Sequence, residues 1–254
     1  MNNFTPIDFH KTRDFSKKLN DTFEFVRQNI KPLGKSILFI AGPPVLIGSL
    51  MLGSFMGDFL NLSQSAVTNP DAIENYFLSA NFWIQIAVGS IFLLISGVAT
   101  MATINNYIIL YGEKKSNQIE VSDVWERVRQ TFWMYLGTMI FFMILFIVAY
   151  SLMLIPMFLL TAISPFLIFF GFIGIVCLIF YLIFGSSLTF FIRAYEKTGF
   201  FAALSRSFYL VRGKWWSTFG LVFILFFIVM TISYLFIIPW YVVTLVTAFH
   251  NTST

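Results

Sequence analysis

Long apolar runs separated by short polar segments dominate the pattern of the chain. Five runs are long enough for a membrane-spanning helix, which needs about 20 apolar residues. They cover residues 36–57, 82–111, 133–155, 165–191 and 215–238. The third and fourth come from one stretch without Asp, Glu, Lys or Arg, which we divide at Pro156 and Pro165 because proline favours helix ends and turns. The pattern predicts an all-α protein, a polytopic bundle of transmembrane helices.

A last apolar run, 240–249, follows Pro239 and is too short to cross a bilayer. Two explanations remain open. The native chain continues beyond Thr254 with a sixth span, or the run forms a half-helix on the outer side. We favour the first and expect six spans in the native protein.

Three segments beside the spans have apolar positions at steps of three and four, which is the pattern of an amphipathic helix. These segments are 14–33, 121–132 and 199–213. In the second, Asp123 is the expected N-cap, with Glu126 three residues later as in a capping box. Because they adjoin spans, we predict three interfacial helices lying along the cytoplasmic surface of the membrane.

The amphipathic segments also share letters, which suggests an internal repeat. A Val-Arg pair precedes a glycine in each, at Val26-Arg27, Val128-Arg129 and Val211-Arg212. We interpret the chain as a single membrane domain, 1–254, built from units 9–111 and 112–192 and an incomplete unit 193–254. Chance matches of this size also occur, so the repeat is a hypothesis.

Composition and charge narrow the class of protein further. Apolar residues make up 58% of the chain and charged residues 11%, whereas soluble domains average about 45–50% and about 25%. This excludes an ordinary soluble domain and a disordered chain, and the single cysteine, Cys177, excludes an internal disulfide.

The basic residues predict the topology. All 16 Lys and Arg fall within 11–35, 114–129 and 193–214, whereas the segment after the first span carries only acidic charges, at Asp58, Asp71 and Glu74. Basic loops remain in the cytoplasm. We therefore expect a cytoplasmic N-terminus and an external C-terminus. Since every basic cluster borders a span, the net charge of +4 does not indicate a nucleic-acid partner.

Catalytic chemistry has few candidates in this chain. His10 and His250 fall on opposite predicted sides, and no predicted span contains a carboxylate. We therefore expect no catalytic residue, no metal site and no cofactor, and we predict that the protein is not an enzyme.

Polar residues near the cytoplasmic ends of the second and fourth spans have two interpretations. They are Asn105, Asn106, Ser186 and Ser187. They form either a polar vestibule for a substrate path or interhelical hydrogen bonds, and we favour hydrogen bonding. The neighbouring Gly185 indicates close helix packing rather than a phosphate loop.

Basic residues on the amphipathic helices are the candidate contacts with a protein partner or an anionic lipid. They are Arg27, Lys31, Arg127, Arg129, Arg206, Arg212 and Lys214.

Two segments resemble a known family. AALSRSFYLVRGKWW at 202–216 and FSKKLNDTFEFVRQN at 15–29 are similar to bacterial polytopic membrane proteins related to the membrane domain fused to some glycerophosphodiester phosphodiesterases. The resemblance covers about residues 9–239 and implies a six-span protein of the bacterial inner membrane. Most stand-alone members have no assigned function. The phosphodiesterase domain is absent here, so the resemblance implies no hydrolase activity.

Two functions remain open at this stage. The first is a non-enzymatic scaffold or accessory subunit that docks a protein partner, a further copy or anionic lipid through its amphipathic helices. The second is a transporter or flippase for a lipidic or apolar solute. A continuous cavity reaching Asn105, Asn106 and Ser186 would favour transport, and a tightly packed bundle would favour the scaffold.

Overall fold

The computed structural model describes residues 6–8, 11, 13–69 and 71–252. The molecule is all-helical in this part, with 89% helix and no strand. The elements are α1 (Phe15–Ile40), α2 (Gly42–Thr68), α3 (Ala72–Leu78), α4 (Ala80–Lys114), α5 (Val121–Ile163), η1 (Pro165–Leu167), α6 (Ile168–Ser186), α7 (Thr189–Glu196), α8 (Phe200–Val211) and α9 (Trp215–Thr252). Within these residues, five helices are long and apolar enough to cross a membrane, which agrees with the five predicted spans.

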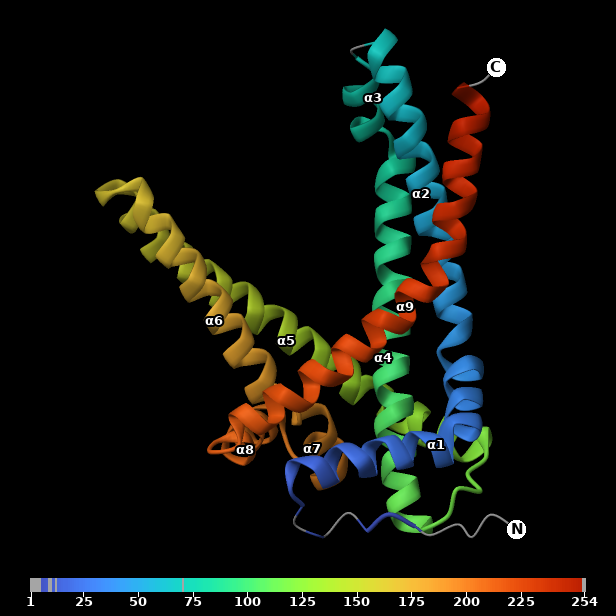
Figure 1. The fold of residues 1–254 in the computed structure, drawn as a ribbon, viewed down its shortest axis with the longest axis vertical. Helices are drawn as coiled ribbons and strands as arrows, with labels where there is room; N and C mark the ends of the chain where they lie inside the picture. The colour runs from blue at the N-terminus through green and yellow to red at the C-terminus, as the bar shows by residue number, and fades with distance from the viewer. Residues whose placement is uncertain (1–5, 9–10, 12, 70, 253–254) are drawn as a thin grey trace.

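The first span begins later than the sequence predicted. α1 ends at Ile40 and α2 starts at Gly42, so residues 36–40 belong to the amphipathic helix and the span covers Gly42–Leu62. Proline is accommodated in the first turn of a helix, where its missing N–H needs no partner, and Pro43 and Pro44 occupy that turn of α2. Figure 1 shows α1 lying across the base of the molecule and α2 rising from its end.

The second amphipathic segment is not a separate helix. Residues 121–132 and the third predicted span form one helix, α5, because no glycine or proline stands at their junction. Its N-cap is Glu120, with Asp123 as the capping-box partner, so the predicted cap at Asp123 was wrong. Pro156 lies inside α5, and the turn into α6 comes only at Ser164. In membrane helices, neighbouring groups can compensate for the backbone hydrogen bond that proline removes.

The third unit does separate its amphipathic helix from its span. α8 ends at Val211, and Gly213 adopts a φ of +80°, a conformation that few residues other than glycine tolerate. The second unit has Gln130 at the corresponding position, and its helix continues. The second and third units therefore differ in how the amphipathic helix joins the span, and the repeat remains a hypothesis.

The apolar run 240–249 is neither a separate half-helix nor a sixth span within the part of the chain described. It continues α9 through Pro239. The apolar window itself covers Trp215–Pro239.

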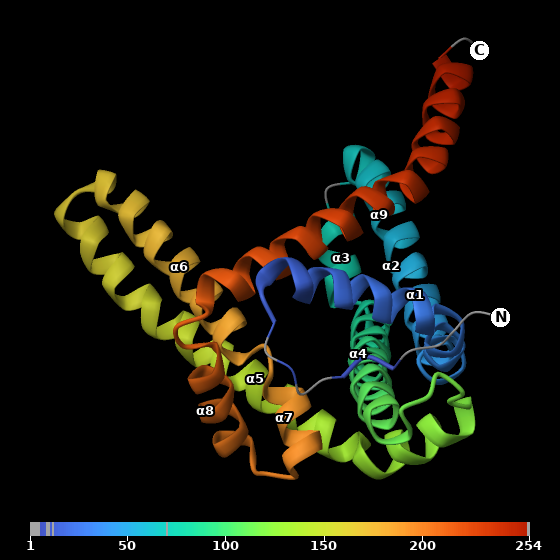
Figure 2. The same cartoon turned by 60° about the horizontal axis from the view of Figure 1, so that its bottom comes forward.

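The hairpins α2–α4 and α5–α6 extend to the same side of the molecule, and α1, α7 and α8 gather at the opposite end (Figures 1 and 2). We call this opposite end, together with the start of α5, the collar end. α1, the first helix, lies there, and α9, the last helix, ends at the other end. The apolar core also sits at the collar end, around Tyr107, Tyr111, Val124, Val128 and Tyr135.

Candidate functional site

Buried hydrogen bonds fix α1 against α4 at the collar end. The hydroxyl of Tyr107 donates to Oδ1 of Asn29 over 2.8 Å, and both side chains are fully buried. One turn further along α4, the hydroxyl of Tyr111 donates to Oε1 of Gln28 over 3.2 Å. The sequence analysis missed these contacts, although a lone Asn among the apolar positions of an amphipathic helix is a usable signal. Because α1 is fixed in rotation, its basic residues face a defined direction.

A groove with basic residues lies between α1 and the segment that precedes α5. Arg27, Lys31 and Lys35 recur at every fourth position of α1 and therefore share one face of the helix. They line a cavity of about 800 Å³ whose other wall is residues 117–121. We call this cavity the basic groove.

The charge of the basic groove is only partly compensated. Its one carboxylate, Glu120, caps α5 and also accepts a hydrogen bond from Ser122. Arg27 pairs with Glu24 at 3.1 Å, but this pair is exposed to solvent and contributes little. Among the described residues, Lys31 and Lys35 have no ion-pair partner. The groove is therefore a site of excess positive charge.

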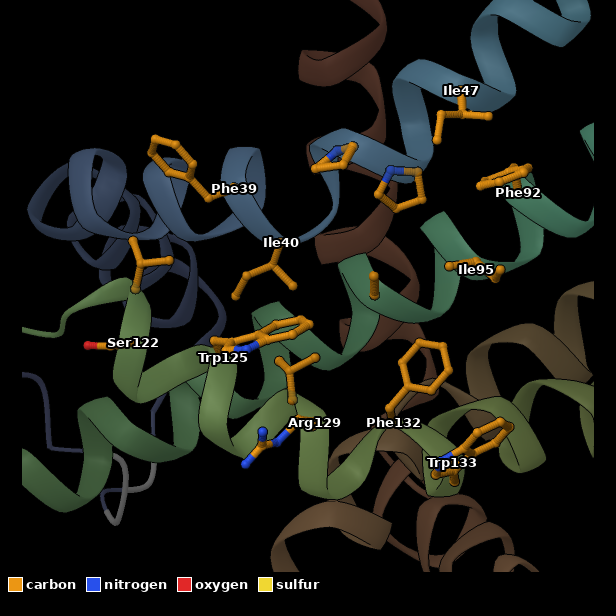
Figure 3. Close-up of a pocket in the computed structure, with 15 residues that line it drawn as sticks. Phe39, Ile40, Ile47, Phe92, Ile95, Ser122, Trp125, Arg129, Phe132 and Trp133 are labelled. Atoms are coloured by element: carbon orange, nitrogen blue, oxygen red, sulfur yellow. The ribbon is translucent and has the colours of Figure 1, made fainter.

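An apolar pocket adjoins the basic groove and shares Val121 with it. It has a volume of about 700 Å³, within the range of about 300–1,000 Å³ typical of small-molecule sites. Figure 3 shows Trp125 and Phe132 projecting from α5 toward the junction of α1 and α2, with Ile95 of α4 above Phe132 in this view. Pro43 and Pro44 form part of the wall, so the break between α1 and α2 helps to create the pocket.

Among the described residues, Arg129 is the only charged one that lines the apolar pocket. It lies on the α5 side of the pocket, one turn beyond Trp125 (Figure 3). The described part of the chain offers it no carboxylate partner. Its neighbour Arg127 lies on another face of α5 and holds both carboxylate oxygens of Glu113, so that arginine is already paired.

The remaining basic candidates lie elsewhere at the collar end. Arg206 is 3.7 Å from a carboxylate oxygen of Glu196 and also lies over the ring of Tyr209. Arg212 and Lys214 are exposed at the turn between α8 and α9 and line neither the basic groove nor the apolar pocket. The structure thus brings Arg27 and Lys31 together in the basic groove, places Arg129 in the adjoining apolar pocket, and leaves the others apart.

The four residues of the predicted vestibule form separate hydrogen bonds. Asn106 is buried and donates to Thr131 of α5 over 2.8 Å, which is an interhelical hydrogen bond. Asn105, Ser186 and Ser187 donate to carbonyls of their own helices. Within the described chain, no hydrogen bond joins the two asparagines to the two serines, and none of the four residues lines the apolar pocket.

A close contact between α6 and α8 surrounds Gly185. A Cβ built on Gly185 would overlap the ring of Phe208. Next to it, the fully buried hydroxyl of Ser207 donates to the carbonyl of Gly185 over 2.6 Å and accepts from the N–H of Leu188. This supports the packing interpretation of Gly185, and it gives Ser207 a role that the sequence analysis missed.

The carboxylate of Asp58 lies in the first span, contrary to the sequence-based expectation. α2 remains helical beyond residue 57, so Asp58 falls within the span Gly42–Leu62. It accepts a hydrogen bond from Gln85 over 2.7 Å, and the same amide donates to Ser54. Burial raises the pKa of nearby Tyr76 above its usual value, and the charge of Asp58 raises it further.

The described residues contain no group of three or more His, Cys, Asp and Glu that could hold a metal ion. His10 lies outside the residues that the structure describes. No protein-family model, curated protein or solved structure matches the chain.

Proposed function

We propose that this protein is a non-enzymatic membrane scaffold that holds anionic phospholipid at its collar end, which faces the cytoplasm. The observation that carries the proposal is the pair Lys31 and Lys35, which have no ion-pair partner among the described residues and lie in a groove whose one carboxylate caps a helix. Basic residues next to spans attract anionic lipid headgroups, each by about 1 kcal/mol.

Anionic lipid explains the collar end better than an acidic protein does. A phospholipid carries a phosphate and an apolar chain, and the basic groove adjoins an apolar pocket. An acidic protein surface would contact only the basic groove and would leave the apolar pocket without a ligand. Aromatic residues of the kind found at membrane interfaces, Trp125 and Trp133, line the same pocket and support a position at the lipid headgroup level.

The transporter remains the alternative, because the apolar pocket could also admit an apolar solute. The residues expected at the mouth of a path do not line the pocket, which favours the scaffold. Membership of the family that the sequence resembles, and a bacterial inner-membrane location, form part of this proposal. A protein partner bound through the lipid-coated collar end is compatible with it.

Neutralising the two lysines tests the proposal. We expect the double variant Lys31→Gln/Lys35→Gln to lower the affinity for phosphatidylglycerol relative to phosphatidylcholine by about 30-fold, from about 1 kcal/mol per lysine. The full chain is placed in nanodiscs that contain equal amounts of the two lipids, and the lipids it retains are counted by native mass spectrometry.

The matched control is Lys17→Gln/Lys18→Gln, which removes the same charge from the same helix outside the groove. This control should change the ratio of retained phosphatidylglycerol to phosphatidylcholine several times less than Lys31→Gln/Lys35→Gln does. Equal ratios for the two double variants would contradict a specific role for the groove.

A further inference from the structure

We infer that the apolar pocket binds one acyl chain of a single phospholipid, whose phosphate contacts Arg129. This inference rests on the proposed function and adds a defined binding site to it. The pocket is formed by elements distant in sequence: the junction of α1 and α2, the middle of α4 and the first turns of α5.

The lining of the pocket matches a hydrocarbon chain. Phe39, Ile47, Phe92 and Phe132 contribute apolar side chains, and the prolines of the α1–α2 break add a wall without N–H donors. Three of the helices that line the pocket, α2, α4 and α5, are long and apolar enough to cross a membrane, so we expect a chain to enter from the hydrocarbon region. A water-soluble ligand would leave this apolar surface without a complementary group.

Arg129 supplies the polar contact that orients the chain. An exposed arginine with no carboxylate partner among the described residues is free to donate two parallel hydrogen bonds to a phosphate. It lies between Trp125 and Trp133 along α5, residues typical of the headgroup level. The phosphate of a lipid in the same leaflet would therefore lie at the height of Arg129 while its chain runs into the pocket.

Photolabelling can locate the chain directly. The full protein is placed in nanodiscs that contain phosphatidylglycerol with a diazirine on one acyl chain, and the adducts are mapped by peptide mass spectrometry. We expect adducts to concentrate in 39–47, 92–99 and 125–133. Adducts spread evenly over all five spans would overturn the inference.

Filling the pocket provides the first variant test. Ile47→Trp should lower labelling of the pocket about tenfold, because the larger ring occupies the space of the chain. Ile86→Trp is the matched control: the two isoleucines are 39% and 37% exposed, and Ile86 lies outside the pocket. Equal labelling of the two variants would contradict the inference, provided that both remain folded by thermal unfolding.

The phosphate contact provides the second test. Arg129→Gln should weaken labelling by the phosphatidylglycerol probe about tenfold, equivalent to about 1.4 kcal/mol. Arg212→Gln, with the same charge change, should leave it unaltered. If wild-type protein shows no preference for anionic lipid yet Ile47→Trp abolishes the adducts, the proposed function fails while the chain site is retained. If the lysine variant loses the preference for anionic lipid but Ile47→Trp and Arg129→Gln both keep wild-type labelling, the acyl site is rejected and the proposed function is retained.

Discussion

Gly185→Ala is expected to destabilise the protein by about 2 kcal/mol, even though alanine is the better helix former. The new methyl group would overlap the ring of Phe208, which packs on Tyr181 at 5.5 Å between ring centres. Moving the ring would also disturb the adjacent hydrogen bond from Ser207 to the carbonyl of Gly185. In a chain of this size the loss corresponds to about 4–8 °C in Tm, measured by thermal unfolding in detergent.

Gly174→Ala on the same helix is the matched control, because a Cβ there meets nothing within 4 Å. It should leave stability unchanged or raise it by up to about 1 kcal/mol. The double variant Gly185→Ala/Phe208→Ala should cost less than the sum of the two single changes, since the two sites are in contact and the overlap is gone when both are changed. Stability changes of the same sign and size at Gly185 and Gly174 would contradict the close packing of α6 on α8.

Asn29→Leu is expected to destabilise the protein by about 2 kcal/mol and to weaken anionic lipid binding without changing any charge. The substitution leaves the buried hydroxyl of Tyr107 without its acceptor, and an unsatisfied buried polar group costs about 1–3 kcal/mol. Because this bond fixes α1 on α4, its loss should also loosen the basic groove. Thermal unfolding and the lipid-retention ratio measure the two effects.

A double-mutant cycle separates this bond from general damage. Tyr107→Phe alone should cost a similar amount, whereas Asn29→Leu/Tyr107→Phe should cost much less than the sum, because both polar partners are then gone. The double variant should also regain lipid retention relative to Asn29→Leu. Additive losses in the cycle would show that Asn29 and Tyr107 do not act as a pair.

Apolar runs predicted the spans of the fold, but prolines did not predict where its helices end. Five spans followed from apolar length, and the outcome at each proline depended on its surroundings: Pro43 and Pro44 begin a helix, whereas Pro156 and Pro239 lie inside helices. Sequence reasoning ran the first span through Pro43 and Pro44 and placed span ends at Pro156 and Pro239, because it could not include the neighbouring helices that compensate for a missing N–H. By contrast, the turn between α8 and α9 is explained by Gly213, whose φ is positive.

The candidate site was predictable only in part. The positions of Lys31 and Arg129 on amphipathic stripes indicated surface cations, but not which of them are paired. Arg127 and Arg129 look equivalent in sequence, yet they lie on different faces of α5 and only Arg127 meets Glu113. The groove and pocket also depend on the contact between Asn29 and Tyr107, which lie 78 positions apart. No local pattern contains that pairing.

The salt dependence of lipid selection by the wild-type protein tests the central claim most directly. The full chain is placed in nanodiscs with equal phosphatidylglycerol and phosphatidylcholine, and retained lipids are counted at about 0.1 M and about 1 M salt, where the screening length falls from about 10 Å to about 3 Å. The proposed function predicts enrichment of phosphatidylglycerol that decreases severalfold at high salt. Equal retention of the two lipids at both salt concentrations would contradict it.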